Sequence, residues 1–413
     1  MLFKDPPART DLHAISMVGL AHGVSHFFHL MLPPLFPWLM RDFSLSFTEA
    51  GALMTTFFVV SGVGQALAGF VVDRIGARRV LFGGIGLLAA SGFVLAAAGS
   101  YAGLMGAAAL AGLGNCVFHP ADFTILNRRV SQPRLGHAFS VHGLSGNLGW
   151  AAAPLFMAGI AGMAGWRTAA VAAGCVGLGM LAVSWWQRVA LELPQETPIA
   201  SAMSNAGAAP QGNSAFAFLG LRPIWLCFGF FLLTTAAFGF LQNYAPPALG
   251  GLYGLSLAAA TFSLTAYLVG GAIGMITGGF IAARSDAGER TIMLALGVGG
   301  LLALVLASGW PPGWSASALM LAMGAAIGVA GPSRDLLVRR AATSTLGANA
   351  YGRIYGFVYS GLDVGLAAAP MIFGPLMDKG EFSASFVLIA LLQTLAILTA
   401  ASVGARVRLA QAG

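Results

Sequence analysis

The stretch GHAFSVHGLSGNLGWAAAPLF (residues 136–156) occurs again, in altered form, in the second half of the chain as GRIYGFVYSGLDVGLAAAPMI (residues 352–372). The two stretches align without gaps and place Gly149 opposite Gly365. Matching segments at corresponding places in both halves indicate an internal duplication. Two further pairs agree with it: GFVVDR (69–74) with GFIAAR (279–284), and HPADFTILNRR with GPSRDLLVRR after one deletion.

The composition of the chain indicates a membrane protein. Of its 413 residues, 57% are hydrophobic and only 8% are charged, whereas a soluble globular chain carries about 25% charged residues. Because so little charge is available to cover a water-facing surface, we expect lipid to cover much of it. Apolar runs of about 20 residues are long enough to span a bilayer. They predict an all-α integral membrane protein with twelve transmembrane helices, at 12–39, 47–72, 79–99, 103–127, 136–160, 166–187, 222–248, 257–283, 291–309, 315–338, 352–376 and 383–405.

One long polar stretch divides these helices into six and six. It covers residues 189–220 and is rich in Pro, Ala, Ser, Gly and Asn. We therefore predict an N-terminal six-helix bundle over 1–188, a cytoplasmic linker over 189–220 and a C-terminal six-helix bundle over 221–413. Corresponding helices run in the same direction, so the repeat is parallel, about an axis along the membrane normal. Two such pseudo-symmetric bundles describe a secondary transporter with a binding chamber between them near the bilayer midplane.

The basic residues indicate how the chain is oriented. They give a net charge of +7, but they lie singly or in short groups between apolar segments, which is a topology signal and not a nucleic-acid-binding surface. With the N-terminus in the cytoplasm, most of the 21 Lys and Arg residues fall on the cytoplasmic side. This positive-inside bias predicts a bacterial-type inner membrane protein with both termini in the cytoplasm. The exceptions are Arg41, Arg167, Arg334 and Lys379.

The loop between the second and third predicted helices resembles that of the major facilitator superfamily. It reads GFVVDRIGARRV (residues 69–80), and its matching residues are Gly69, Asp73, Arg74, Gly76, Arg78 and Arg79. The resemblance covers nearly the whole chain and implies the twelve-helix fold of that family. It also implies that Asp73, Arg74 and Arg78 take part in gating, because an acidic group there can pair with basic groups or a helix N-terminus across the two halves. The second copy has Ala283 where the first has Asp73, so such a contact is absent there.

Within that superfamily, the first half is similar to fosmidomycin-resistance-like transporters. The matching residues lie in the fourth and fifth predicted helices, and the similarity favours efflux of a small polar or anionic compound. One departure is that Ala121 and then Asp122 follow the proline, where the group has an acidic residue directly after it. The residues that match are Phe118, His119, Pro120, Gly146, Asn147 and Gly149.

Three histidines interrupt the first predicted helix. His22, His26 and His29 are spaced i, i+4 and i+7, so a helix presents them on one stripe. We expect them to line a water-accessible path for substrate or protons, because titratable groups inside a membrane protein usually face its interior. Hydrogen bonding between packed helices and a metal site are the alternatives. No metal ligand set is assigned, since no nearby cysteine or acidic residue completes a tetrahedral site, although another helix could supply one.

A second set of polar residues suggests a gate. His119 and Asp122 lie one turn apart in the fourth helix, and the repeat places Arg334 at the position of Asp122. Opposite charges at equivalent positions could meet across the central axis when the cytoplasmic side closes. The local alternative is that Arg334 pairs with its neighbour Asp335.

The remaining candidates concentrate in the second half of the chain. Asp363, which the repeat matches to Asn147, lies at the centre of the eleventh helix, where a carboxyl group can carry a proton or balance a cationic substrate group. Pro33–Pro34 and Pro246–Pro247 predict matching helix breaks at an outer gate. The further candidates for binding substrate or protons are His142, Gln242, Asn243, Tyr244, Tyr355 and Tyr359.

The sequence therefore predicts a proton-coupled, alternating-access transporter of a small organic solute, most simply an exporter of a polar or anionic compound. The alternative is proton-coupled uptake of an organic anion or a metal chelate. We expect a monomer in the lipid bilayer that uses no cofactor and binds no nucleic acid. An enzyme is not expected, because we find no paired catalytic carboxylates, nucleophile elbow or phosphate loop. A sensor built on a transporter fold is not expected either, because we find no large soluble domain to receive a signal.

Overall fold

The computed structural model describes residues 6–193, 220–284, 288–346 and 351–412. Within these ranges the chain is helical, and twelve helical segments are long and apolar enough to cross a membrane. The predicted fold class is thereby confirmed. The first six spans comprise α1 (Pro6–His29) with η1 (Pro33–Leu35) and α2 (Phe36–Phe43), α3 (Phe47–Ile75), α4 (Ala77–Ala97), α5 (Tyr101–Asn115) with α6 (Phe118–Arg129), α7 (Gln132–Ala164) and α8 (Trp166–Trp186). After η2 (Arg188–Leu191), the last six comprise α10 (Arg222–Tyr253), α11 (Leu257–Arg284), α12 (Gly288–Ala307), α13 (Ala316–Leu346) with η4 (Gly313–Ser315) before it, α14 (Tyr351–Asp378) and α15 (Phe382–Ala412).

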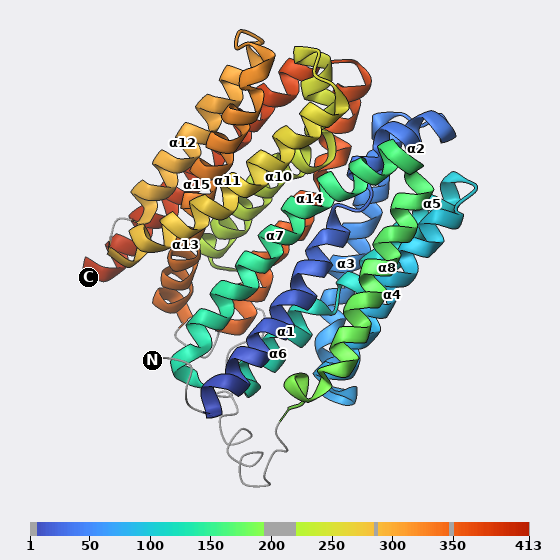
Figure 1. Ribbon diagram of the computed structural model, residues 1–413. Coiled ribbons are helices and arrows are strands. Elements are labelled where there is room, and N and C mark those ends of the chain that lie inside the picture. Colours follow the sequence, from blue (N-terminus) through green and yellow to red (C-terminus); the bar gives the residue numbers. More distant parts are fainter. Residues whose placement is uncertain (1–5, 194–219, 285–287, 347–350, 413) are drawn as a thin grey trace.

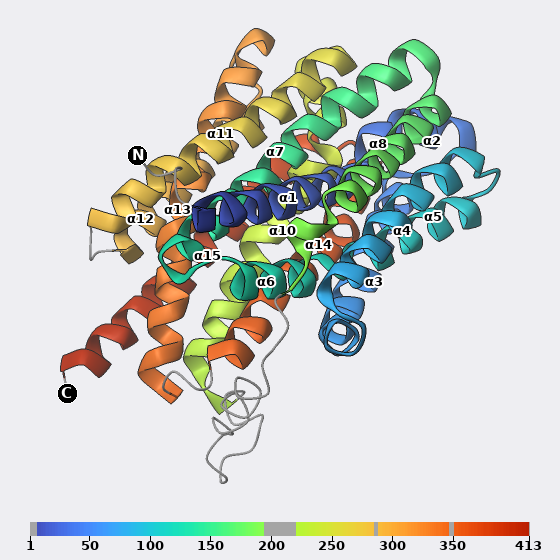
Figure 2. The same ribbon diagram turned by 60° about the horizontal axis from the view of Figure 1, so that its bottom comes forward.

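The helices pack as two pseudo-symmetric groups, α1–α8 (the N-terminal group) and α10–α15 (the C-terminal group). In the N-terminal group α1 packs on α7, α3 on α5, and α4 on α8. The equivalent pairs of the C-terminal group are α10 on α14, α11 on α13, and α12 on α15. The two groups meet where α3 packs on α14 and where α7 packs on α11, and these two crossings are themselves related by the repeat. Figures 1 and 2 show the groups side by side, with α7 between α1 and α11.

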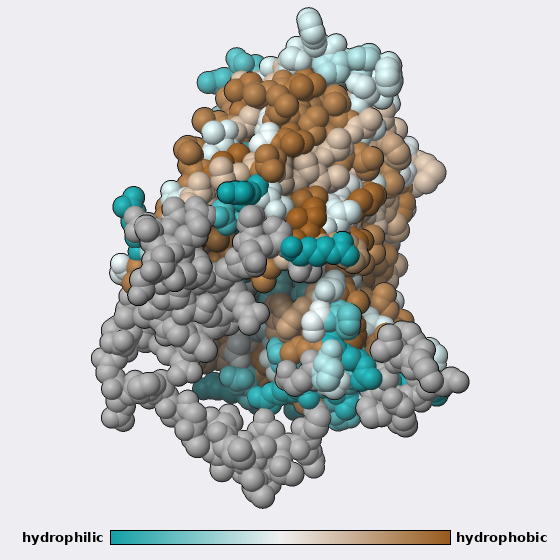
Figure 3. All heavy atoms as spheres, turned by 90° about the vertical axis from the view of Figure 1, so that its left-hand side faces the viewer, coloured by the Kyte–Doolittle hydropathy of each residue, from teal (hydrophilic) through white to brown (hydrophobic). Residues whose placement is uncertain are grey.

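The start of α1 and the end of α15 lie at the same end of the molecule, toward the lower left of Figure 1. We call this the termini end, and the opposite end, which carries α2 and the start of α3, the loop end. The space-filling view shows a broad hydrophobic surface toward the loop end and hydrophilic residues gathered toward the termini end, where the surface is hollowed (Figure 3). A wide apolar band of this kind suits a protein surrounded by lipid.

The predicted helix breaks occur at one of the two expected places. The first span is interrupted after His29 and resumes as a 3₁₀ turn at Pro33. The prediction of a matching break at Pro246–Pro247 is wrong, because α10 continues through both prolines. Each proline removes a backbone donor, but a membrane helix can stay intact when neighbouring helices cover the freed carbonyl groups, and Pro246 and the residues before it are buried.

A break that was not predicted divides the fourth span between α5 and α6. Pro120 lies in the first turn of α6. Because proline has no backbone N–H group, it cannot donate to the carbonyl group of Cys116, four residues earlier. Proline is tolerated in a first turn but not in a helix interior. The chain therefore ends one helix at Asn115 and starts the next at Phe118, which places His119 beside α1.

Glycine allows the closest helix contacts in both groups. A Cβ atom on Gly149 of α7 would overlap the carbonyl oxygen of Gly23 in α1. In the C-terminal group, a Cβ atom on Gly324 of α13 would likewise overlap the carbonyl oxygen of Tyr267 in α11. Small residues at such crossings let helix backbones approach closely, which is how membrane helices gain packing energy without a hydrophobic driving force.

We predict that Gly149→Val destabilises the fold, because the added side chain must push α7 away from α1. Overpacking of this kind costs about 1–3 kcal/mol or more. The apparent melting temperature of the purified protein, measured by intrinsic fluorescence, should fall by several degrees. Gly159→Val in the same helix is the matched control, since a Cβ atom there meets nothing within 4 Å. Equal effects of the two substitutions would contradict the proposed contact.

Candidate functional site

Five of the seven histidines gather with one carboxylate inside the N-terminal group. The residues come from three helices that are far apart in sequence but packed together, α1, α6 and α7. We call this set the histidine cluster: His22, His26 and His29 of α1, His119 and Asp122 of α6, and His142 of α7. His13 and His137 are exposed and lie outside it.

Asp122 is at the centre of the cluster and is fully buried. Its Oδ2 atom lies 3.1 Å from Nε2 of His142 and 3.3 Å from Nδ1 of His22. The His22 and His142 rings stack with centroids 3.5 Å apart. A buried carboxylate is tolerable only with such partners, because an isolated charge in an apolar interior is strongly unfavourable.

Asn115 contacts His29, the last histidine of the α1 stripe. Its Oδ1 atom accepts from Ser25 Oγ at 2.6 Å and lies 2.9 Å from Nε2 of His29, and its Nδ2 atom donates to Ser61 Oγ at 2.8 Å. This amide links α1, α3 and α5. Sequence reasoning missed Asn115, although an asparagine within an apolar run was the available signal.

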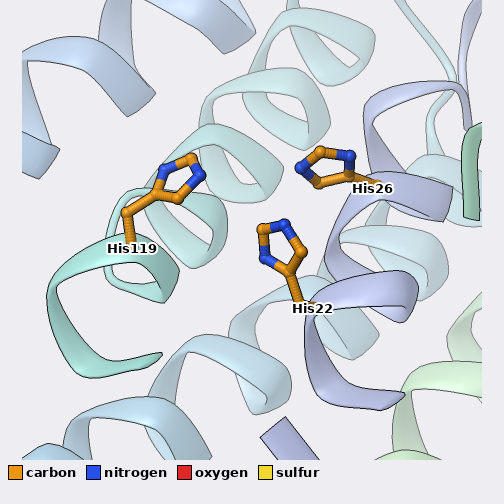
Figure 4. Close-up of side chains that lie close together, drawn as sticks. All are labelled: His22, His26 and His119. Atoms are coloured by element: carbon orange, nitrogen blue, oxygen red, sulfur yellow. The ribbon is translucent and has the colours of Figure 1, made fainter. Parts of the chain in front are cut away.

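His26 and His119 are the two half-buried members of the cluster. His26 stacks on Trp150 with ring centroids 4.3 Å apart, and Nδ1 of His119 lies 2.8 Å from Oε1 of Gln65 in α3. In Figure 4 the rings of His22, His26 and His119 face one another across a common space. The structure thus brings together the histidines that the sequence singled out, but it buries His22, His29 and His142 within one helix group.

Asp363 and Asn147 lie at the two crossings between the groups. The Asp363 side chain of α14 packs against Gly62 of α3, and it has no hydrogen-bond or ion-pair partner among the described residues. Asn147 of α7 donates to the carbonyl of Gly143 and lies 3.7 Å from the sulfur of Met275 in α11. The repeat-related positions therefore occupy equivalent places at the seam.

The predicted gate pair is not formed in this structure. No ion pair joins Asp122 to Arg334 among the described residues, since Asp122 contacts His22 and His142 of its own group. Arg334 instead donates from Nε to Asp335 at 2.9 Å, which is the local alternative, and its guanidinium lies 4.7 Å from the Phe231 ring centroid. The Tyr359 hydroxyl also donates to Asp335, at 2.9 Å. The Tyr355 side chain lies outside the described residues.

The family-type loop after α3 is at the termini end. Asp73 and Arg74 are exposed there, while Nη1 of Arg78 lies 3.2 Å from the Glu192 carboxylate in the segment after α8. Arg78 therefore contacts its own helix group in this conformation. A gating role for Asp73, Arg74 and Arg78 stays a prediction.

The loop end closes where the groups contact each other directly. The Tyr244 hydroxyl of α10 donates to the carbonyl of Phe47 at 3.0 Å, and Thr55 donates to the carbonyl of Ala367 at 2.8 Å. Tyr244 thus joins the two groups in this structure, and its role in binding substrate or protons stays a prediction. Its neighbours Gln242 and Asn243 are also buried, and Nδ2 of Asn243 donates to the carbonyl of Gly239 at 2.7 Å.

Asp378 completes this seal and was not predicted. Its carboxylate accepts from the backbone N–H groups of Phe47 and Thr48 and from the Thr48 hydroxyl. The end of α14 thereby caps the first turn of α3, and a carboxylate is favourable at a helix N-terminus because of the unpaired N–H groups and the helix dipole. One side chain therefore fastens the two groups together at the loop end.

We predict that Asp378→Asn loosens the loop end, because the amide keeps the shape but loses the charge that favours the α3 N-terminus. The measurement is double electron–electron resonance between spin labels at Ala102 and Ser308, which are exposed loop-end positions of the two groups, in a variant without the native cysteines. The distance distribution should broaden and shift to longer values. Glu381→Gln, an exposed carboxylate in the same loop, should leave it unchanged, and a matching shift in this control would contradict the assignment.

Comparisons with known proteins agree with the fold. The family model of the Major Facilitator Superfamily matches residues 18–348. The membrane sensor protein UhpC of Escherichia coli is 26% identical over 405 residues, covering 92% of this chain and 89% of that protein. The fosmidomycin resistance protein of Escherichia coli is 31% identical over 151 residues, 37% of each chain. The gallate transporter of Pseudomonas putida is 26% identical over 302 residues, 64% of each chain.

The matched region covers most of the chain, and the two six-helix groups are those of this fold. The chain belongs to the Major Facilitator Superfamily, whose members transport small solutes across membranes.

Proposed function

We propose that this protein is a proton-coupled transporter that moves a small organic solute by alternating access, with Asp363 as the proton-carrying group. The termini end faces the cytoplasm of a bacterial-type cell, and the protein acts as a monomer in the inner membrane. The single observation that carries the proton assignment is the position of Asp363 at the crossing of α3 and α14, half-buried and without a described partner. A carboxyl group inside a membrane span is costly unless it serves a function.

The loop end is closed and the termini end is hollowed, which supports access from the termini end. The loop end is sealed by Tyr244, Thr55 and Asp378, whereas the surface is hollowed toward the termini end (Figure 3). The basic residues lie mostly at the termini end, which the positive-inside rule assigns to the cytoplasm. In this reading the structure is the inward-facing state, and rocking of the two groups would open the loop end.

The surroundings of Asp363 favour reversible protonation. The helix α13 packs on α14. Its charged side chains within the described residues are Arg334 and Asp335, which pair with each other. Charged residues of the other packed helices lie at helix ends: Glu49, Asp73 and Arg74 in α3, and Arg222 in α10. When the loop end opens, water reaches Asp363 from outside. When it closes, the carboxyl group loses that water, which costs less for a neutral acid than for a carboxylate.

The proposed direction is export of a polar or anionic compound. Similarity to the fosmidomycin resistance protein supports export. The Arg334 guanidinium, which lies over Phe231 and pairs with Asp335 in this structure, would bind an anion by exchanging that partner. Similarity to the gallate transporter supports the second candidate, which is uptake of an organic anion. Substrate accumulation that collapses with an uncoupler would indicate uptake, and accumulation that rises would indicate export.

Similarity to a membrane sensor protein supports a third candidate function, that of a sensor. A sensor binds its ligand without net transport. Flux in proteoliposomes therefore separates it from both transport candidates.

We predict that Asp363→Asn uncouples transport from protons. In the export mechanism, external protons load Asp363, so lowering the external pH should accelerate efflux by the wild type, and this acceleration should be lost in the amide variant. The assay follows fosmidomycin and gallate as probe anions in proteoliposomes at several external pH values.

Two variants make this test specific. Asp363→Glu keeps a proton carrier and should retain the pH dependence, while Glu381→Gln removes an exposed carboxylate and should behave as wild type. An Asp363→Asn variant that transports with an unchanged pH dependence would rule out the proton role.

A further inference from the structure

The histidine cluster contains two groups of metal-ligating side chains that share one residue. The first is His22, His26 and His119, and the second is His22, Asp122 and His142. In each group the candidate ligand atoms lie within 4.8 Å of one another. They come from three helices of one group, so rocking of the two groups would not separate them.

The ring orientations favour the first group as the ligands. Nδ1 of His26 and Nε2 of His22 would both contact a Cβ atom built on Gly146, at 2.6 and 3.1 Å, so these two nitrogens face the same small space. In Figure 4 the His119 ring of α6 faces the rings of His22 and His26. Glycine at position 146 leaves that space open. The imidazole nitrogens of α1 and α6 therefore lie close enough together to bind one cation.

Several atoms of the cluster have no hydrogen-bond partner although they are buried. Among the described residues these include Nδ1 of His22, Nδ1 of His26 and Oδ1 of Asp122. The His22 side chain is only 2% exposed and that of Asp122 is not exposed at all. Nδ1 of His22 approaches Asp122 Oδ2 to 3.3 Å without the geometry of a hydrogen bond. Buried polar atoms normally have partners. The unpaired Nδ1 of His26 is therefore available to a cation, while Nδ1 of His22 faces Asp122 and leaves Nε2 as the ligand atom of that ring.

We propose that His22, His26 and His119 bind one divalent first-row transition cation, of which Zn²⁺ is the best match, and that Asp122 orients His22. Three neutral imidazoles are a common zinc ligand set, which leaves a fourth position for water or a solute. A carboxylate beside the second nitrogen of a ligand histidine fixes the orientation of the ring and raises its basicity. The donors are nitrogen and oxygen, which suits Zn²⁺, Ni²⁺ or Co²⁺ better than a soft cation such as Cu⁺.

The α1 histidines alone did not predict this site, because the third imidazole comes from α6 and reaches α1 only through the break after Asn115. The site goes beyond the proposed transport function. A bound cation would fasten α6 to α1 and neutralise the charge of Asp122, whatever the solute. It can therefore be tested without any transport assay.

The test uses the full chain, purified through a tag without histidine, stripped with a chelator and titrated with Co²⁺ and then Zn²⁺. The wild type should bind one cation per chain, and Co²⁺ should give the visible absorption bands of a four-coordinate site with nitrogen ligands. His119→Ala and His26→Ala should weaken binding at least tenfold, and Asp122→Asn should weaken it by about 10–100-fold, as expected for a group that orients a ligand.

The exposed histidines provide the matched controls. His13→Ala and His137→Ala remove an imidazole outside the cluster and should leave binding unchanged. His119→Gln is the second variant, to be used if His119→Ala does not fold, and the melting temperature without metal reports folding in each case. Absence of the absorption bands in the wild type, or binding that is equally strong in wild type and His26→Ala, would overturn the proposal.

Discussion

Close contact between helix backbones is the constraint on which the rest of this structure depends. In lipid, helices gain little from burying apolar side chains, so packing, interhelical hydrogen bonds and small residues must hold them together. Gly149 against Gly23 sets the distance between α1 and α7, and Gly324 against Tyr267 does the same for α11 and α13. Because these contacts lie within each group, each group can move as a unit.

The polar residues inside the N-terminal group differ from those at the seam between the two groups. Inside the N-terminal group, Asn115 bonds to His29 and Ser61, and Asp122 contacts His142. Those at the seam are few, and Asp363 has no described partner. In the proposed mechanism the Asp363 carboxyl group changes its protonation as the seam opens and closes, whereas the histidine cluster, which lies within one group, keeps its neighbours.

Much of the fold was predictable, because hydropathy and the repeat depend on the sequence alone. The twelve spans, the parallel duplication and the break at Pro33 follow from the length and the proline content of apolar runs. The expected break at Pro246–Pro247 failed because neighbouring helices, which a single sequence does not reveal, support α10 through both prolines. For the same reason Asn115, Gln65 and Asp378 were missed: each acts through a partner that lies more than 50 residues away along the chain. Histidine spacing correctly placed three rings on one stripe of α1 but could not show that neighbouring helices would bury two of them.

The most direct test of the account is to lock the loop end and measure transport. Thr48 and Asp378 contact each other across the groups, so a disulfide between cysteines at these two positions, in a variant without the native cysteines, would hold that end shut. Alternating access predicts that oxidation abolishes flux and that reduction restores it, while oxidation does not change the flux of either single-cysteine variant. Undiminished flux through the fully oxidised, cross-linked protein would contradict the account.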